Sequence, residues 1–232
     1  MAMSGAAEVE THPLIGLFGG TFDPIHLGHL QLAEGVLGAT PMAELRLIPA
    51  RVPPHRPSPK TRPEDRVALI EAALTNRDPR LRLDRREICR EGPSYMVDTL
   101  DSLRAELGDD RPLALILGAD AFLGLERWSR WRRLPRLCHL IVLARSGSGS
   151  EPVLKLAQKL GMSVTADPAQ LTVSPAGTLL PLPLTEIDCS STLIRERLKK
   201  GASVAGLTPP EVLWEIRRRG LYGVPPCQTQ KA

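Results

Sequence analysis

The chain has 232 residues and a formal net charge of +4, with 42% hydrophobic and 24% charged residues. These fractions are ordinary for a soluble globular protein and exclude a disordered or fibrous one. The small positive net charge, without a dense Lys/Arg block, suits a protein that binds anionic small molecules, and it predicts no nucleic-acid partner. No apolar run approaches the roughly 20 residues that span a bilayer, so no membrane partner is expected.

The cysteines and the first residues predict a cytoplasmic protein. Residues 1–11 lack the basic start and the apolar core of a signal peptide. The four cysteines lie far apart, without a CxxC pair or zinc-type spacing to histidine, and are Cys89, Cys138, Cys189 and Cys227. We therefore expect reduced thiols and no protein-held metal. We also expect residues 1–11 and 225–232 to be disordered and residues 12–224 to form one domain.

Apolar runs alternate with segments of helical spacing along the chain. In chain order we predict a strand at 14–18, a helix at 27–37, a strand at 44–48, helices at 63–74 and 94–107, strands at 113–117 and 140–143, and helices at 191–200 and 209–219. The proline-rich segment 50–62 and the Gly/Ser segment 146–150 are predicted loops. Ser94 and Thr208 are the predicted N-caps of their helices. The pattern indicates an α/β fold, a doubly wound, Rossmann-like parallel sheet with helices on both faces.

A glycine pair and two histidines surround the first predicted strand-to-helix junction. The segment reads Gly-Gly-Thr-Phe-Asp-Pro-Ile-His-Leu-Gly-His from Gly19 to His29. The glycines allow a sharp turn and close approach of a ligand, and the helix start offers free N–H groups to an anion. His26 and His29 share one face of the first turn and can donate to phosphate oxygens. Taken singly, such histidines are more often unrelated surface residues. A zinc pair lacks a third ligand nearby, and GxGxxG and Walker A patterns are absent.

The segment from Gly20 to His29 resembles the signature of the HxGH nucleotidyltransferase superfamily. That resemblance implies nucleotidyl transfer from a nucleoside triphosphate, with a second element near the C-terminus at Ser190-Ser-Thr-Leu-Ile-Arg195. Cys189 stands there where the superfamily usually has Ile, a packing position. The implied catalytic residues are His26, His29 and Arg195. The implied ATP-binding residues are Gly19, Gly20, Thr21, Phe22, Gly118, Asp120, Ser190, Ser191 and Thr192.

Further segments resemble those of bacterial nicotinate mononucleotide adenylyltransferases, in the same order along the chain. They are Val52-Pro-Pro-His-Arg56, the run from Ser94 to Thr99, Gly118-Ala-Asp120 and Trp128. An indole is well suited to stack on a flat, electron-poor pyridine ring. The mononucleotide-binding residues that the resemblance implies are His55, Arg56, Tyr95, Asp98, Thr99, Trp128 and Arg145.

The resemblance implies that ATP and nicotinate mononucleotide are joined to give nicotinate adenine dinucleotide and pyrophosphate, a step in NAD biosynthesis. Mg²⁺ is the expected cofactor, held mostly by the nucleotide and water. Two alternatives stay open: an adenylyltransferase for nicotinamide mononucleotide or phosphopantetheine, and a non-catalytic nucleotide-binding module. The sequence leaves the oligomeric state open, a homodimer included.

Overall fold

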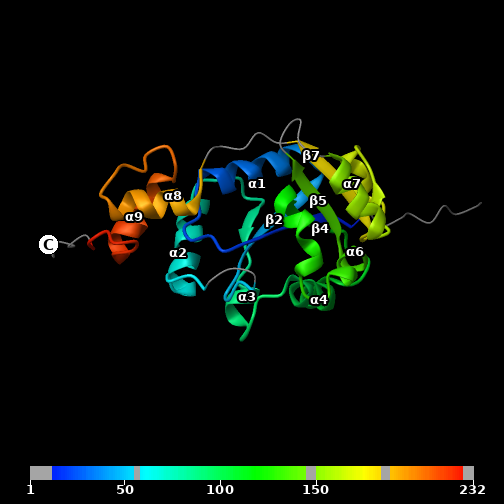
Figure 1. Cartoon of the computed structure of the whole chain (residues 1–232), viewed down its shortest axis with the longest axis horizontal. Coiled ribbons are helices and arrows are strands. Elements are labelled where there is room, and N and C mark those ends of the chain that lie inside the picture. The colour runs from blue at the N-terminus through cyan, green and yellow to red at the C-terminus, as the bar shows by residue number, and fades with distance from the viewer. Residues whose placement is uncertain (1–11, 55–57, 145–149, 184–188, 227–232) are drawn as a thin grey trace, which may run out of the picture.

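A seven-stranded parallel sheet forms the centre of the protein (Figure 1). The computed structural model describes residues 12–54, 58–144, 150–183 and 189–226. Within them the strand order is β3-β2-β1-β4-β5-β7-β6, and every pairing is parallel. The strands are β1 (Leu14–Gly20), β2 (Met42–Pro49), β3 (Leu81–Leu83), β4 (Leu113–Gly118), β5 (His139–Ala144), β6 (Ser163–Val164) and β7 (Thr178–Pro183).

Helices cover both faces of this sheet, as predicted. One core lies under α1 (Leu27–Ala39), α2 (Pro63–Leu74), α8 (Ser191–Lys199) and α9 (Pro210–Arg219). The second core lies under α4 (Met96–Leu107), α6 (Leu134–Leu137) and α7 (Ser150–Lys159). The shorter elements are α3 (Arg86–Cys89), α5 (Ala119–Leu123) and the 3₁₀ turns Leu125–Arg127, Trp131–Arg133 and Pro168–Thr172. In the described parts of the chain, none of the helices has the length and apolarity to cross a membrane.

The first strand shows why the strands read as continuous apolar runs. Leu14 is buried in the core under α1, whereas Ile15 and Leu17 are buried in the core on the opposite face. Because successive side chains of a strand point to opposite faces, a sheet covered on both faces requires apolar residues at every position.

The order of the strands reverses between β1 and β4. From β1 the chain moves outward to β2 and β3, then returns to β4 beside β1 and moves outward again to β5. Ligands of open α/β sheets bind at such a switch point, outside the carboxyl ends of the strands. Gly20 and Gly118 end β1 and β4 at this edge.

Two predicted helix caps are wrong, because other segments use their hydroxyl groups. Helix α4 begins at Met96, and the Ser94 Oγ instead accepts the backbone N–H of Arg51 at 2.9 Å. Helix α9 begins at Pro210 without a side-chain cap, and the Thr208 hydroxyl donates to the Ile25 carbonyl at 3.4 Å. Both hydroxyls therefore tie a helix start to a loop at the carboxyl edge of the sheet.

Strand β7 was not predicted, because it contains Pro181 and Pro183. Its pairing with β6 involves only Thr178 and Leu179. Within the described residues, the rest of β7 pairs with β5 alone. Its prolines, which have no N–H group, therefore interrupt no backbone hydrogen bonds on the side of β7 that faces away from β5. Of the predicted loop 146–150, residues 146–149 lie outside the described ranges, and Ser150 begins α7.

Candidate active site

The loop after β1 is shaped by close contacts that require glycine. A Cβ at Gly20 would lie 2.9 Å from the Phe22 ring, and Phe22 itself has a φ of 49°. The guanidinium of Arg66, on α2, is fully buried beneath this loop. It donates to the Thr21 carbonyl at 2.7 Å and to the Arg51 carbonyl at 3.3 Å. Arg66 therefore fastens the loop after β1 to the loop after β2.

His26 occupies the N-cap position of α1, and its imidazole is buried. A Cβ at position 28 would lie 3.1 Å from both Cε1 and Nδ1 of His26, so Gly28 leaves the space that the ring fills. The Nδ1 atom of His26 has no hydrogen-bond partner among the described residues. The glycine between the two histidines is thus a packing requirement of the first histidine.

The two imidazoles lie against each other, with ring centroids 3.7 Å apart and planes 34° apart. The edge of the pair packs on Phe22, whose ring centroid is 5.0 Å from that of His29. His29 Nδ1 accepts the backbone N–H of His26 at 3.3 Å, which in the neutral ring leaves the proton on Nε2. His29 is thereby held as a donor through Nε2.

Burial lowers the pKa of His26 from 6.5 to about 4, so this ring is neutral at neutral pH. The unfolded chain then binds more protons than the folded chain between these two values. Folding stability should be complete above pH 6.5 and fall by about 3 kcal/mol as the pH drops to 4. Burial also lowers the pKa of His139, so the measurement is a difference: chemical denaturation of the wild type and of His26→Asn between pH 4 and 7. An equal slope for both proteins would contradict the buried neutral His26.

The two halves of the predicted site meet although about 170 residues separate them. Ser191 Oγ donates to the Pro24 carbonyl at 2.9 Å, and Arg195 Nη1 donates to the Asp23 carbonyl at 2.7 Å. Tyr222, which follows α9, donates its hydroxyl to Asp23 Oδ1 at 2.8 Å. The start of α8 is therefore bound directly to the loop that carries the histidines.

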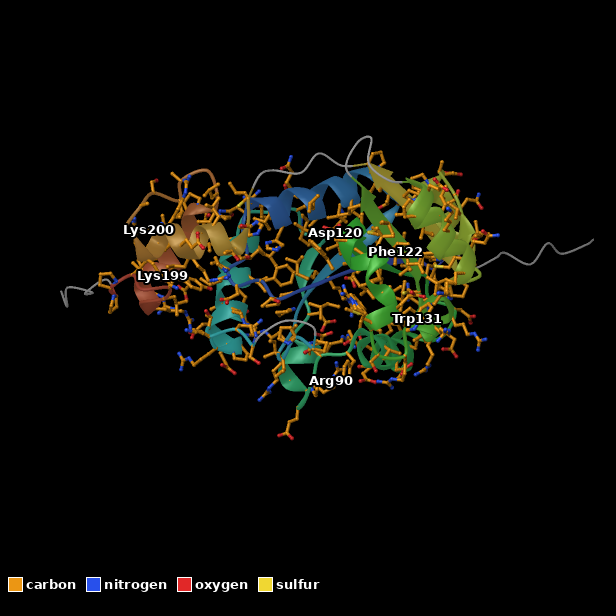
Figure 2. The ribbon with its side chains drawn as sticks, viewed as in Figure 1. Arg90, Asp120, Phe122, Trp131, Lys199 and Lys200 are labelled. Atoms are coloured by element: carbon orange, nitrogen blue, oxygen red, sulfur yellow. The ribbon has the colours of Figure 1, made fainter. Side chains whose placement is uncertain are left out.

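A cleft of about 1770 Å³ opens at this junction, along the carboxyl edge of the sheet. Its lining includes most of the predicted residues, namely Gly19, Gly20, Thr21, Phe22, His26, His29, Tyr95, Gly118, Asp120, Trp128, Ser190, Ser191, Thr192 and Arg195. Figure 2 shows Asp120 near the middle of the molecule, between the parts that carry α8 and α7. The cleft thus brings together the histidine loop, the start of α8 and the region around Trp128.

Two predicted residues do not line this cleft. Asp98 forms an ion pair with Arg130 at 2.6 Å, and Thr99 is fully buried. The Thr99 hydroxyl donates at 2.6 Å to the carboxyl group of Glu87, a residue that does line the cleft. Burial raises the pKa of that carboxyl. The predicted residues His55, Arg56 and Arg145 lie outside the described residues.

Sequence reasoning missed Arg66, Glu87 and Tyr222. A signal existed for Arg66, which occupies the buried stripe of α2 together with Val67 and Ile70. An arginine in an apolar stripe indicates a guanidinium that binds buried carbonyls. For Tyr222 no spacing could have shown that a residue after the last helix returns to Asp23.

Comparison with known proteins supports the family that the motifs suggest. A family model described as cytidylyltransferase-like matches residues 17–197. The probable nicotinate-nucleotide adenylyltransferase of Halorhodospira halophila is 48% identical over 211 residues, which cover 91% of this chain and 96% of that protein. The chain belongs to the nicotinate-nucleotide adenylyltransferase family. The member from Methylococcus capsulatus is 46% identical over 209 residues, or 90% of this chain and 99% of its own.

Membership makes the chain a nucleotidyltransferase, and solved structures show the same fold. The nicotinic acid mononucleotide adenylyltransferase of Plasmodium falciparum, complexed with NaAD, superposes with a TM-score of 0.72 at 18% identity. The match covers 92% of this chain and 99% of that chain. The family fold is therefore present over nearly the whole length of this chain.

Proposed function

We propose that this protein transfers the adenylyl group of ATP to nicotinate mononucleotide, giving nicotinate adenine dinucleotide and pyrophosphate. The observation that carries the proposal is the direct bonding of Ser191 and Arg195 to the Pro24 and Asp23 carbonyls, beside the paired imidazoles. This arrangement supports the proposal, because groups that can donate to phosphate oxygens then line one cleft.

The chemistry requires no side-chain base. The 5′-phosphate of the mononucleotide has a second pKa of about 6 and is ionised near neutral pH. One of its oxygens forms a bond to the α-phosphorus of ATP, and the bond from that phosphorus to the bridging oxygen of the β-phosphate breaks. The electron pair leaves with pyrophosphate. Positioning and stabilisation of negative charge are therefore the tasks of the protein.

The histidines and α8 divide these tasks. The Nε2–H of His29 is assigned to the oxygens of the transferring phosphoryl group, and the neutral ring of His26 supports His29 from the side. Arg195 is assigned to the leaving pyrophosphate, together with the Thr192 hydroxyl, which lies 3.2 Å from Arg195 Nη2. Ser190 Oγ accepts the Leu193 N–H at 3.2 Å and so fixes the helix start that faces the phosphates.

Trp128 is assigned to the nicotinate ring. It follows the 3₁₀ turn Leu125–Arg127, is only partly buried and lines the cleft with Tyr95. Trp128→Ala should raise the KM for the mononucleotide about tenfold and change kcat little, because stacking stabilises ground and transition states equally. Steady-state kinetics test this, with Trp214→Ala as the control, since Trp214 on α9 is 64% exposed and does not line the cleft. An unchanged KM in Trp128→Ala would remove the stacking assignment.

We propose Mg²⁺ as the metal that accompanies ATP. Among the described residues, no three His, Cys, Asp or Glu side chains are grouped closely enough to hold a metal ion. Mg²⁺ binds phosphate oxygens and keeps several of its waters, which fits a cleft where the triphosphate supplies most ligands. When bound, the ion neutralises part of the triphosphate charge.

The direct test is product identification. Incubation with ATP, Mg²⁺ and nicotinate mononucleotide should give nicotinate adenine dinucleotide and pyrophosphate in equal amounts, measured by mass spectrometry and a coupled pyrophosphate assay. ATP binding without any dinucleotide from this acceptor or from nicotinamide mononucleotide would reject the proposal and favour a nucleotide-binding module.

A further inference from the structure

The cleft continues beyond Arg195 into a region that the family motifs do not describe. Three parts of the chain line it there. The segment before α2 contributes Lys60, Thr61 and Arg62, α8 contributes Lys199, and the segment after α9 contributes Tyr222 and Gly223. We call these six residues the distal end of the cleft. It includes the end of α8 and the segment after α9, and Figure 1 shows α8 and α9 on the opposite side of the molecule from α6 and α7.

Lys199 faces the cleft from the same side of α8 as the motif residues. Residues 191, 195 and 199 are spaced by four, which places them on one face of a helix, and all three line the cleft. Lys200 is adjacent in sequence and exposed but does not line the cleft. Figure 2 shows both lysines at the end of α8.

Among the described residues, neither Lys60 nor Lys199 has an acidic partner, and of the described lysines these two line the cleft. Lys155 is paired with Glu151 and Lys159 with Glu126. Within the described ranges, no carboxylate lies within 4.0 Å of the ammonium group of Lys60 or of Lys199. Both are exposed cations in a concave site, which is a favourable place for an anion.

A chain of contacts joins the two lysines to the phosphate end of the cleft. Thr61, next to Lys60, lies close to the Tyr222 hydroxyl, which donates a hydrogen bond to Asp23. Gly223, next to Tyr222, lies beside Lys199, since a Cβ on that glycine would be 3.7 Å from Lys199 Cγ. The lysines therefore flank the segment that contacts Asp23.

The buried carboxylate of Asp65, beside the distal end, is already paired with two arginines. Asp65 accepts from Arg62 at 2.8 Å and from Arg219 at 2.9 Å, and these bonds, the one from Arg62 first, lower its pKa. One carboxylate oxygen of Asp23 accepts from Tyr222. Within the described residues, Arg62 is thus paired with Asp65, whereas the ammonium groups of Lys60 and Lys199 have no ion-pair partner.

We propose that Lys60 and Lys199 bind the terminal phosphate, which is the γ-phosphate of ATP before transfer and one end of pyrophosphate after it. This inference rests on the proposed function. Arg195 holds the side of the leaving group nearest the reacting phosphorus, and the two lysines extend that contact toward the distal end. They contribute to the affinity for the leaving group and not to binding of the acceptor near Trp128.

The test is the reverse reaction, in which the dinucleotide and pyrophosphate give ATP and the mononucleotide. Lys60→Met and Lys199→Met should each raise the KM for pyrophosphate about fourfold at low ionic strength, and the double variant roughly tenfold or more. The KM for the dinucleotide is the internal reference, and we expect it not to rise with the KM for pyrophosphate. Added KCl should shrink the difference from the wild type, because exposed charges are screened.

Lys200→Met is the matched control, since it removes an equal charge one residue away from the cleft. An unchanged KM for pyrophosphate in the double variant, or an equal rise in Lys200→Met, would overturn the proposal. Calorimetric titration with inorganic pyrophosphate separates this test from the proposed function, because it needs no acceptor. A wild type that binds pyrophosphate but converts no dinucleotide would reject the acceptor while the variants still decide the role of the lysines. Equal pyrophosphate affinity in the wild type and the double variant would reject that role.

Discussion

His29→Ala is expected to lower kcat by two to three orders of magnitude, about what is lost with one preorganised donor to a developing oxyanion. His29 Nδ1 accepts the His26 N–H at 3.3 Å, and the ring is held against Phe22, so its Nε2–H has a fixed direction. The ring is only partly buried. Its removal should therefore leave the fold intact, and thermal unfolding checks this beside single-turnover kinetics.

His29→Asn separates the donor role from a purely structural one. The asparagine oxygen can accept the His26 N–H as Nδ1 does, but it carries no donor at the position of Nε2. Asn should thus restore the local contact and leave kcat as low as in the alanine variant. Near-normal turnover in a well-folded His29→Ala, or full rescue by Asn, would contradict the assignment to the phosphoryl group.

Arg104→Met is expected to lower the free energy of unfolding by about 3–5 kcal/mol, with a fall in Tm of roughly 10 °C. Arg104 lies on α4, and its nearly buried guanidinium donates to backbone carbonyls from three parts of the chain. The acceptors, at 2.6–3.2 Å, are the carbonyls of Gly108, Asp109, Arg111, Leu137 and Pro175. Methionine fills the space but leaves these carbonyls without their donor.

Arg133→Met is the matched control for Arg104. The Arg133 guanidinium also contacts α4, through Asp101 at 2.8 Å, but this ion pair is about half exposed. Its loss should cost less than about 1 kcal/mol. Chemical denaturation of both variants gives the comparison. Equal free energies of unfolding would show that the carbonyl contacts of Arg104 contribute no more than an exposed ion pair.

The elements around the first motif were predictable because local sequence alone determines them. Strand β1 is continuously apolar, the glycine pair follows it, and α1 begins immediately after His26. Both the strand and the helix were confirmed within two residues of their predicted ends. The same holds for α2, where Pro63 occupies the first helical position.

Elements at the two edges of the sheet were missed for physical reasons. Strand β6 has two residues and β3 has three, too short for an alternating pattern to be visible. Helix α7 follows a Gly/Ser run that reads as a loop, although Val153 and Ala157 bury one face of it.

The candidate site shows a similar division. Most residues carried by motifs line the cleft, whereas contacts that depend on folding were not predicted. Ser191 binds the Pro24 carbonyl and Tyr222 binds Asp23 across most of the chain length, and no local spacing encodes either contact. The use of Ser94 and Thr208 hydroxyls by distant loops likewise became visible only in three dimensions.

Pyrophosphate release from ATP and Mg²⁺, measured side by side with nicotinate mononucleotide and with nicotinamide mononucleotide, tests the proposed reaction most directly. We expect rapid release with the acid and a kcat/KM many times lower with the amide. Preference for the amide would contradict the assigned acceptor, and absence of release with both would contradict the proposed catalysis.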